Sequence, residues 1–176
     1  MTAHPWTRLS EESLRVGYRR IKRCHFQFPD GHSDTYDLLD EGLVVCMLAL
    51  TPDHHVILAR QYRPGPDAIL LELPGGKVEP DETPEHAARR ELLEETGWDG
   101  HFQLAGQAFH CGYSSRRIFN FAVTNCHKVQ AQTLDRNEDI DVVAMPLAEF
   151  RAHLQSGQLT DVATGYQCLD FLGLLS

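Results

Sequence analysis

One short segment of the chain carries readable signals for both ends of an α-helix, and it limits the possible folds more than any other. Thr83 can accept a hydrogen bond as an N-terminal cap, and Pro84 suits the first helical position. Gly97 can adopt the left-handed conformation that ends a helix. Because Ala88 and Leu92 form an apolar stripe between these ends, we expect one side of the helix to pack against a core.

The same helix carries three glutamates on one side. Glu91, Glu94 and Glu95 stand at positions i, i+3 and i+4, within about a third of the circumference and beside the apolar stripe. Each pair of like charges costs about 1 kcal/mol in water and about 4 kcal/mol at an effective dielectric constant of about 20. No lysine follows at i+4 to compensate. The cluster is therefore either an acidic face in solvent or a site for Mg²⁺ or Mn²⁺, since no Cys or His shares this face to favour zinc.

The remaining chain mixes strands and helices without strict alternation, which favours an α/β layer sandwich with a mixed sheet over a doubly wound parallel fold. Residues 43–50 are apolar on both faces, as in a central strand that is buried from both sides. Residues 14–28 and 35–39 flank a turn at 29–31, which predicts an N-terminal hairpin. Further strands are expected at 55–60, 69–73, 102–109, 118–124 and 140–145, and helices at 147–155 and 162–172, the second capped by Thr160 or Asp161.

Composition excludes several classes of protein. The 176 residues, 42% of them hydrophobic, suit one compact domain and not a disordered chain. No apolar run approaches the roughly 20 residues of a membrane span, and the first residues lack the apolar core of a secretory signal. The net charge of −9 disfavours nucleic acid as a partner. Five cysteines, an odd number without a C-x-x-C motif, argue against a disulfide framework and favour the reducing cytoplasm.

Basic residues are concentrated at the start of the chain, where six lie within the first 23 positions. They suit a solvated edge strand whose charges protect it against aggregation. They also suit a contact surface for a partner subunit or an anionic ligand, and the sequence leaves both interpretations open.

Glycines and charged residues around the predicted helix follow one spacing: Gly, five residues, Glu, seven residues, and then Arg-Glu-Leu-x-Glu-Glu-x-Gly. This pattern resembles the signature of the Nudix hydrolases. The resemblance implies a Nudix-type α/β/α sandwich with a mixed sheet and a small N-terminal β-hairpin region. It implies a single domain over 1–176, with about 1–40 as a hairpin and dimerisation region and 41–176 as the catalytic core. The seven invariant positions are matched by Gly76, Glu82, Arg90, Glu91, Glu94, Glu95 and Gly97.

The resemblance also implies a metal-dependent reaction, in which water attacks a phosphorus of a nucleoside diphosphate linked to another moiety. Mg²⁺ is the expected cofactor, with Mn²⁺ as a possible substitute. Arg90 would orient a carboxylate of the motif rather than meet the substrate. The implied metal ligands are the carbonyl of Gly75 and the carboxylates of Glu91, Glu94 and Glu95; the implied catalytic residues are Glu94, Glu95, Glu138 and Arg90.

Segments outside the motif resemble the ADP-ribose pyrophosphatase branch of this family, which implies hydrolysis of ADP-ribose to AMP and ribose 5-phosphate by a homodimer. Arg63 would then bind the diphosphate or the terminal ribose, unless it is an ordinary strand-end arginine. Glu72 would contribute to the substrate or metal site. Phe28 would contact adenine, unless it only packs in the hairpin. Glu138 could act as the general base from an acidic loop. The segments are 60–63, 71–76, 137–140 and 157–161.

Two departures from that branch keep other functions in consideration. Residues 111–116 stand where the branch has Pro-Gly-Phe-Ser-Asp-Glu, and Arg116 replaces the final acid. Arg136 stands at the position where the branch has its catalytic general base. Glu138, two positions further on, is then the acid that could take this role. The alternatives are a GDP-sugar or a dinucleotide as the substrate, or a Nudix fold that senses a ligand without turnover. The three repelling glutamates argue against the sensor, because a sensor has no need of them.

Overall fold

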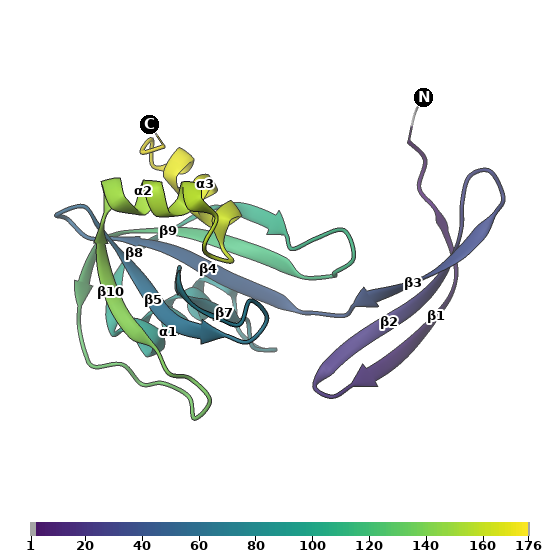
Figure 1. The fold of residues 1–176 in the computed structure, drawn as a ribbon, viewed down its shortest axis with the longest axis horizontal. Helices are drawn as coiled ribbons and strands as arrows, with labels where there is room; N and C mark the ends of the chain where they lie inside the picture. Colours follow the sequence, from purple (N-terminus) through teal and green to yellow (C-terminus); the bar gives the residue numbers. More distant parts are fainter. Residues whose placement is uncertain (1–2, 176) are drawn as a thin grey trace. The chain divides into compact units, whose positions relative to one another are not determined.

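The computed structural model describes residues 3–175, and the chain forms two compact units. The N-terminal unit comprises the described residues up to Gly42 together with Phe109–Arg117. The core unit comprises Leu43–Ala108 and the described residues from Ile118 onward. Each unit has its own β-sheet (Figure 1). None of the helices within residues 3–175 has the length and apolar character needed to pass through a membrane.

The sheet of the N-terminal unit has one strand more than the sequence predicts. The expected turn at 29–31 is present, but the segment 14–28 is not a single strand. The chain reverses at Gly17, whose φ of 62° lies in the left-handed region that glycine adopts readily. A lone glycine is a weak turn signal, which explains the error. The antiparallel strands are, in spatial order, β1 (Thr7–Val16), β2 (Arg19–Gln27) and β3 (Ser33–Leu39).

The core unit is built on a mixed sheet, as the sequence predicts, and this sheet has seven strands. Its strands are β4 (Leu43–Leu50), β5 (His55–Arg63), β6 (Ala68–Glu72), β7 (Gly75–Lys77), β8 (Trp98–Phe109), β9 (Arg117–Lys128) and β10 (Asp141–Pro146). The main path runs β10-β5-β4-β9-β8, while β6 pairs with β5 and β7 with β4. The sequence does not predict β7, because two glycines in three residues carry no strand signal. The helices are α1 (Pro84–Thr96), α2 (Leu147–Ser156) and α3 (Val162–Phe171).

Helices cover both faces of this sheet, with α1 on one face and α2 and α3 on the other (Figure 1). The strand β4 supplies both cores, because successive side chains of a strand point to opposite faces. Leu48 shares one core with Phe150 of α2 and Leu169 of α3. Met47 shares the other core with Leu92 of α1. The predicted α/β/α sandwich is therefore confirmed.

Both expected ends of α1 are also confirmed. Thr83 Oγ1 accepts a hydrogen bond from the backbone N–H of His86 at 3.2 Å, and Gly97 ends the helix with φ 75°. Gly97 is needed for a second reason, because a β-carbon there would overlap the carbonyl oxygen of Gln130. The segment that follows β9 therefore lies directly against the C-terminal end of α1.

Candidate active site

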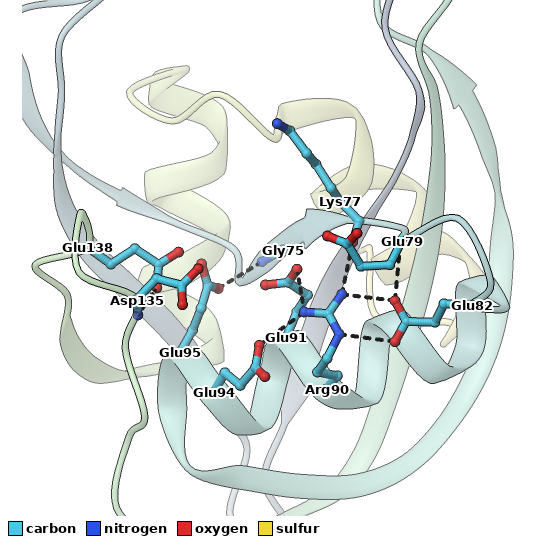
Figure 2. A network of polar contacts seen from close by, with 10 residues as sticks. All are labelled: Gly75, Lys77, Glu79, Glu82, Arg90, Glu91, Glu94, Glu95, Asp135 and Glu138. Carbon is cyan, nitrogen blue, oxygen red and sulfur yellow. Dashed lines mark hydrogen bonds and ion pairs between the residues drawn. The ribbon is translucent and has the colours of Figure 1, made fainter. Parts of the chain in front are cut away.

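Arg90 lies at the centre of the carboxylate cluster (Figure 2). Its Nε and Nη2 donate to the two oxygens of Glu82, at 3.0 and 2.9 Å, in a bidentate ion pair that lowers the pKa of Glu82. Nη2 also donates to the carbonyl of Lys77 at 3.0 Å. Nη1 donates to Glu91 at 2.9 Å and to Glu94 at 3.0 Å. All five N–H groups are thus engaged within the protein, so Arg90 holds carboxylates in place and does not face a substrate.

Glu95 is the most deeply buried carboxylate of α1, with 4% of its surface exposed. Its Oε2 accepts a hydrogen bond from the backbone N–H of Gly75 at 2.9 Å. Burial, with smaller contributions from the charges of Glu91 and Glu138, raises the pKa of Glu95 to about 8. Burial raises the pKa of Glu91 as well. A cation at this point would offset both the desolvation and the repulsion.

Two glycines bring the backbone of β7 against these carboxylates. A β-carbon at Gly75 would overlap the carbonyl oxygen of Val45 on the neighbouring strand β4. A β-carbon at Gly76 would overlap the carboxylate of Glu91. Only glycine allows so close an approach, which explains why glycine stands at both positions.

The chemistry of the donors fits a hard divalent cation, because carboxylate and backbone oxygens are the ligands that such ions prefer. Glu91 and Glu94 turn toward Arg90, and within residues 3–175 no three His, Cys, Asp or Glu side chains converge in an arrangement that could hold a metal ion. The fit rests instead on the half-buried Glu91 and the buried Glu95, which repel each other, and on Gly76, whose missing β-carbon leaves room for the Glu91 carboxylate. The ligand set stays a prediction.

The loop between β9 and β10 brings Glu138 to the helix carboxylates (Figure 2). Its charge helps to raise the pKa of both Glu91 and Glu95. Two hydrogen bonds fix it within the loop: the N–H of Asp135 donates to Oε2 of Glu138 at 2.9 Å, and the N–H of Glu138 donates to the carbonyl of Asp135 at 2.9 Å. The fold therefore brings an acid from a distant part of the chain beside Glu95.

Gln132 also lies at this site, and the sequence reasoning missed it. Its Nε2 donates to the carbonyl of Glu95 at 2.6 Å and to the carbonyl of Ile140 at 3.0 Å. No local pattern marks a single glutamine in a loop, because both of its partners are backbone groups of other elements.

Arg63 and Glu72 lie together on the neighbouring strands β5 and β6. Glu72 is fully buried and accepts hydrogen bonds from Nε of Arg63 and from Oγ1 of Thr160, whereas 39% of the Arg63 side chain is exposed. Asp161 precedes α3, but its Oδ2 accepts the N–H of Leu73 at 3.1 Å and its side chain does not cap the helix. Burial, and then the charge of Glu72, raises the pKa of Asp161 to about 6. Arg63 can therefore reach a ligand, while the buried Glu72 holds its guanidinium from one side.

Phe28 belongs to an aromatic cluster within the N-terminal unit. Its ring stacks on His32 with 4.0 Å between the centroids, and the Trp6 ring lies 4.1 Å away. Among the described residues of this unit, Cys24 has the only buried hydrophobic side chain. The Phe28 ring is half-buried and stays partly accessible.

The basic residues near the start of the chain have partners inside the N-terminal unit. Five of them form ion pairs with acidic side chains, and Arg15 donates to the carbonyl of Gly17. This pairing neutralises much of their charge and favours a solvated surface over an anion-binding one. The five are Arg8, Arg19, Arg20, Lys22 and Arg23.

Comparisons with known proteins identify a family and a fold. A family model described as NUDIX domain matches residues 40–162. An ADP-ribose pyrophosphatase of Bacillus subtilis is 27% identical over 143 residues, which cover 80% of this chain and 77% of that protein. A GDP-mannose pyrophosphatase of Yersinia enterocolitica is 29% identical over 159 residues, with 76% and 82% covered. A solved structure described as an ADP compounds hydrolase matches the fold with a TM-score of 0.80, at 20% identity and over 99% of each chain.

Proposed function

The chain belongs to the Nudix hydrolase family, and we propose that it hydrolyses the diphosphate of ADP-ribose to give AMP and ribose 5-phosphate. One water molecule adds across the P–O–P bridge: its oxygen ends on one phosphate, and the bridging oxygen leaves on the other. The observation that carries the proposal is the buried Glu95 beside the charges of Glu91 and Glu138. In its ionised form such a group opposes folding unless a bound cation offsets its charge, which supports a cation site at Glu95.

Mg²⁺ is the cofactor that this donor set favours, with Mn²⁺ as a substitute, because every donor is a hard oxygen. The carboxylates of Glu91, Glu94 and Glu95 and the carbonyl of Gly75 would hold it. When bound, the ion lowers the pKa of the attacking water and screens the charge of the diphosphate. Arg90 contributes by holding Glu91 and Glu94 in place, which makes it a positioning residue.

Glu138 is the proposed general base, which accepts a proton from the attacking water. Its proximity to Glu95 supports this role, as does the hydrogen bond from the Asp135 N–H that directs its carboxylate. Glu94 is the alternative base, since its side chain is 42% exposed and can serve as a ligand or as a proton acceptor. A kcat that falls strongly in Glu138→Gln and weakly in Glu94→Gln would identify Glu138.

Arg63 is the proposed contact for the diphosphate or the terminal ribose, because its planar guanidinium matches phosphate oxygens. The buried Glu72 supports Arg63 as its counter-ion. Phe28 is the proposed contact for adenine, since aromatic rings stack on nucleobases and this ring is partly accessible.

The relatives favour two substrate classes, an ADP-sugar and a GDP-sugar. Assays of the purified full chain with Mg²⁺ should therefore compare ADP-ribose, GDP-mannose and a diadenosine polyphosphate. We expect the highest kcat/KM for ADP-ribose, with AMP and ribose 5-phosphate as the products. A higher kcat/KM for GDP-mannose or for the dinucleotide would assign that compound as the substrate instead, while the reaction would still be hydrolysis of a diphosphate.

The proposal also competes with a Nudix fold that binds a nucleotide without hydrolysing it. Glu95→Gln should reduce kcat at least about 100-fold and leave the circular dichroism spectrum unchanged. Glu85→Gln, on the exposed first turn of the same helix, is the matched control and should keep full activity. Nucleotide binding by the unmodified protein without turnover of any substrate, with Mg²⁺ or with Mn²⁺, would establish the sensor instead.

We further propose that the chain acts as a homodimer, with about 1–40 as the dimerisation region and 41–176 as the catalytic core of one Nudix domain. A three-stranded sheet with one buried hydrophobic side chain among its described residues has too little core to be stable alone. Trp6 keeps 45% of its surface exposed there. Sedimentation equilibrium should give twice the mass of the chain, and a monomer at micromolar concentration would contradict the proposal.

We propose the reducing cytoplasm as the working compartment. All five cysteines lie within the described residues, and none of them forms a disulfide. Free thiols persist where glutathione and thioredoxin keep them reduced.

A further inference from the structure

One side chain ties the C-terminal end of α1 to the start of β10. The single Nε2 of Gln132 donates one hydrogen bond to the carbonyl of Glu95 and another to the carbonyl of Ile140, at 2.6 and 3.0 Å. The first acceptor belongs to the last turn of α1, whose carbonyls have no partner inside the helix. The second belongs to a buried residue directly before β10. A primary amide suits this task, because one nitrogen carries two protons.

The loop that carries Glu138 is held at both of its ends. At its first end, the N–H of Thr133 donates to the carbonyl of Glu94 at 2.9 Å. At its second end, Ile140 is held by Gln132. Between these ends, within the part of the chain that the structure describes, Glu138 forms hydrogen bonds only with Asp135 of the same loop. The position of Glu138 relative to Glu95 therefore depends on Gln132.

We propose that Gln132 is a positioning residue of the hydrolysis reaction, which holds the Glu138 loop at a fixed distance from Glu95. The inference rests on the proposed function, since it takes Glu138 as the general base. General-base catalysis requires the carboxylate within hydrogen-bond reach of the water, and a shift of about 1 Å can cost about 100-fold in rate. Gln132 itself touches neither water nor substrate; it sets where Glu138 stands.

The test compares Gln132→Met with Gln130→Met, in which a glutamine of the same segment with an exposed side chain is replaced. We expect kcat of Gln132→Met to fall about 10- to 100-fold, with KM within about twofold of the unmodified protein. Gln130→Met should keep both constants. Gln132→Asn, whose amide can reach one of the two carbonyls, should retain part of kcat and serves as the second variant if Gln132→Met does not fold. Equal kcat in Gln132→Met and the unmodified protein would overturn the proposal.

A double-mutant cycle separates positioning from a merely structural effect. In a Glu138→Gln background, which already lacks the base, adding Gln132→Met should cause no further loss of kcat. The same loss in both backgrounds would show that Gln132 acts through α1 and not through Glu138, and would overturn the assignment.

Amide hydrogen exchange tests, without any turnover, whether the two hydrogen bonds of Gln132 hold the loop. We expect faster exchange across residues 133–139 in Gln132→Met and unchanged exchange in Gln130→Met. Unchanged exchange in Gln132→Met would overturn the inference alone, whatever the activity. Faster exchange in a protein that hydrolyses none of the diphosphates would overturn the proposed function and leave the tie itself established.

Discussion

Gly76 lies so close to Glu91 that a β-carbon at position 76 would overlap the carboxylate of that glutamate. The three nearest atoms all belong to the far end of the flexible Glu91 side chain, so an added methyl group would displace Glu91 without unfolding the protein. The close approach therefore belongs to the site and not to the stability of the sheet.

Gly76→Ala is accordingly expected to weaken Mg²⁺ binding about 10- to 100-fold, because it moves the carboxylate of Glu91, a proposed ligand. Its melting temperature should stay within a few degrees of the unmodified protein. Calorimetric titration with MgCl₂ measures the first quantity and thermal unfolding the second. Gly65→Ala is the control, since a β-carbon at Gly65 meets nothing within 4 Å. Equal magnesium affinity in both variants would remove Glu91 from the ligand set.

Arg90→Lys should lower kcat more than its preserved charge suggests. A lysine cannot form the bidentate pair with Glu82 and at the same time hold Glu91 and Glu94, because it lacks the planar fork of five N–H groups. We expect a loss of about 10- to 100-fold in kcat. The control is Arg89→Lys, at the preceding position, where the arginine pairs with Asp99. It should keep nearly full activity. Similar kinetics in the two variants would show that Arg90 does not organise the site.

Glu72→Gln should raise KM and change kcat little. The substitution removes the charge that holds Arg63, while the amide oxygen still accepts the Thr160 hydroxyl. With a less constrained guanidinium, KM for the diphosphate substrate should rise about 10-fold. The control is Asp141→Asn, which breaks the exposed ion pair between Asp141 of β10 and Arg60 of β5, the strand that also carries Arg63. It should leave KM unchanged. A fall in kcat at constant KM would assign Glu72 to the reacting centre instead.

Asp161→Asn should stabilise the protein above pH 7. The folded chain binds a proton at Asp161 with a pKa of about 6, above the ordinary value of 3.8, so between these values it holds more protons than the unfolded chain. The contribution of Asp161 to the free energy of unfolding therefore falls as pH rises through this window. Asparagine does not titrate and can still accept the Leu73 N–H.

Thermal unfolding between pH 4 and 8 measures this effect. The melting temperature of Asp161→Asn should exceed that of the unmodified protein at pH 8, and the difference should shrink toward pH 4. Asp170→Asn, at an exposed position of α3, should show no such trend. A pH-independent difference for Asp161→Asn would mean that the surroundings of Asp161 do not raise its pKa.

Comparison of individual elements shows where sequence reasoning succeeded. The ends of α1 at Thr83 and Gly97 follow from hydrogen bonds to residues three or four positions away. The two-sided burial of β4 follows from its composition alone. The turn at Gly17 and the short strand β7 were missed, because neither carries enough local signal to compete with its neighbours.

The residues around the carboxylates divide in the same way. Arg90 and its glutamates could be grouped from their spacing on one helix, and the structure joins them by direct hydrogen bonds. Gln132 could not be found, because its partners are two backbone carbonyls of different elements. Glu72 could be identified as a candidate, but its complete burial could not be predicted. That burial depends on the packing of β6 against the segment that precedes α3, where Thr160 donates to Glu72.

By itself, the sequence determined the helix α1, its ends and the crowding of Glu91, Glu94 and Glu95 on one side of it. These features depend on backbone hydrogen bonds and side-chain directions within a few residues, which any chain with this segment would share. Only the tertiary structure decided that Glu138 stands beside Glu95 and that Glu72 holds Arg63 with the help of Thr160. Glu72 and Thr160 are 88 positions apart, and such contacts exist only once the packed sheet has offset the entropy of closing the chain between them.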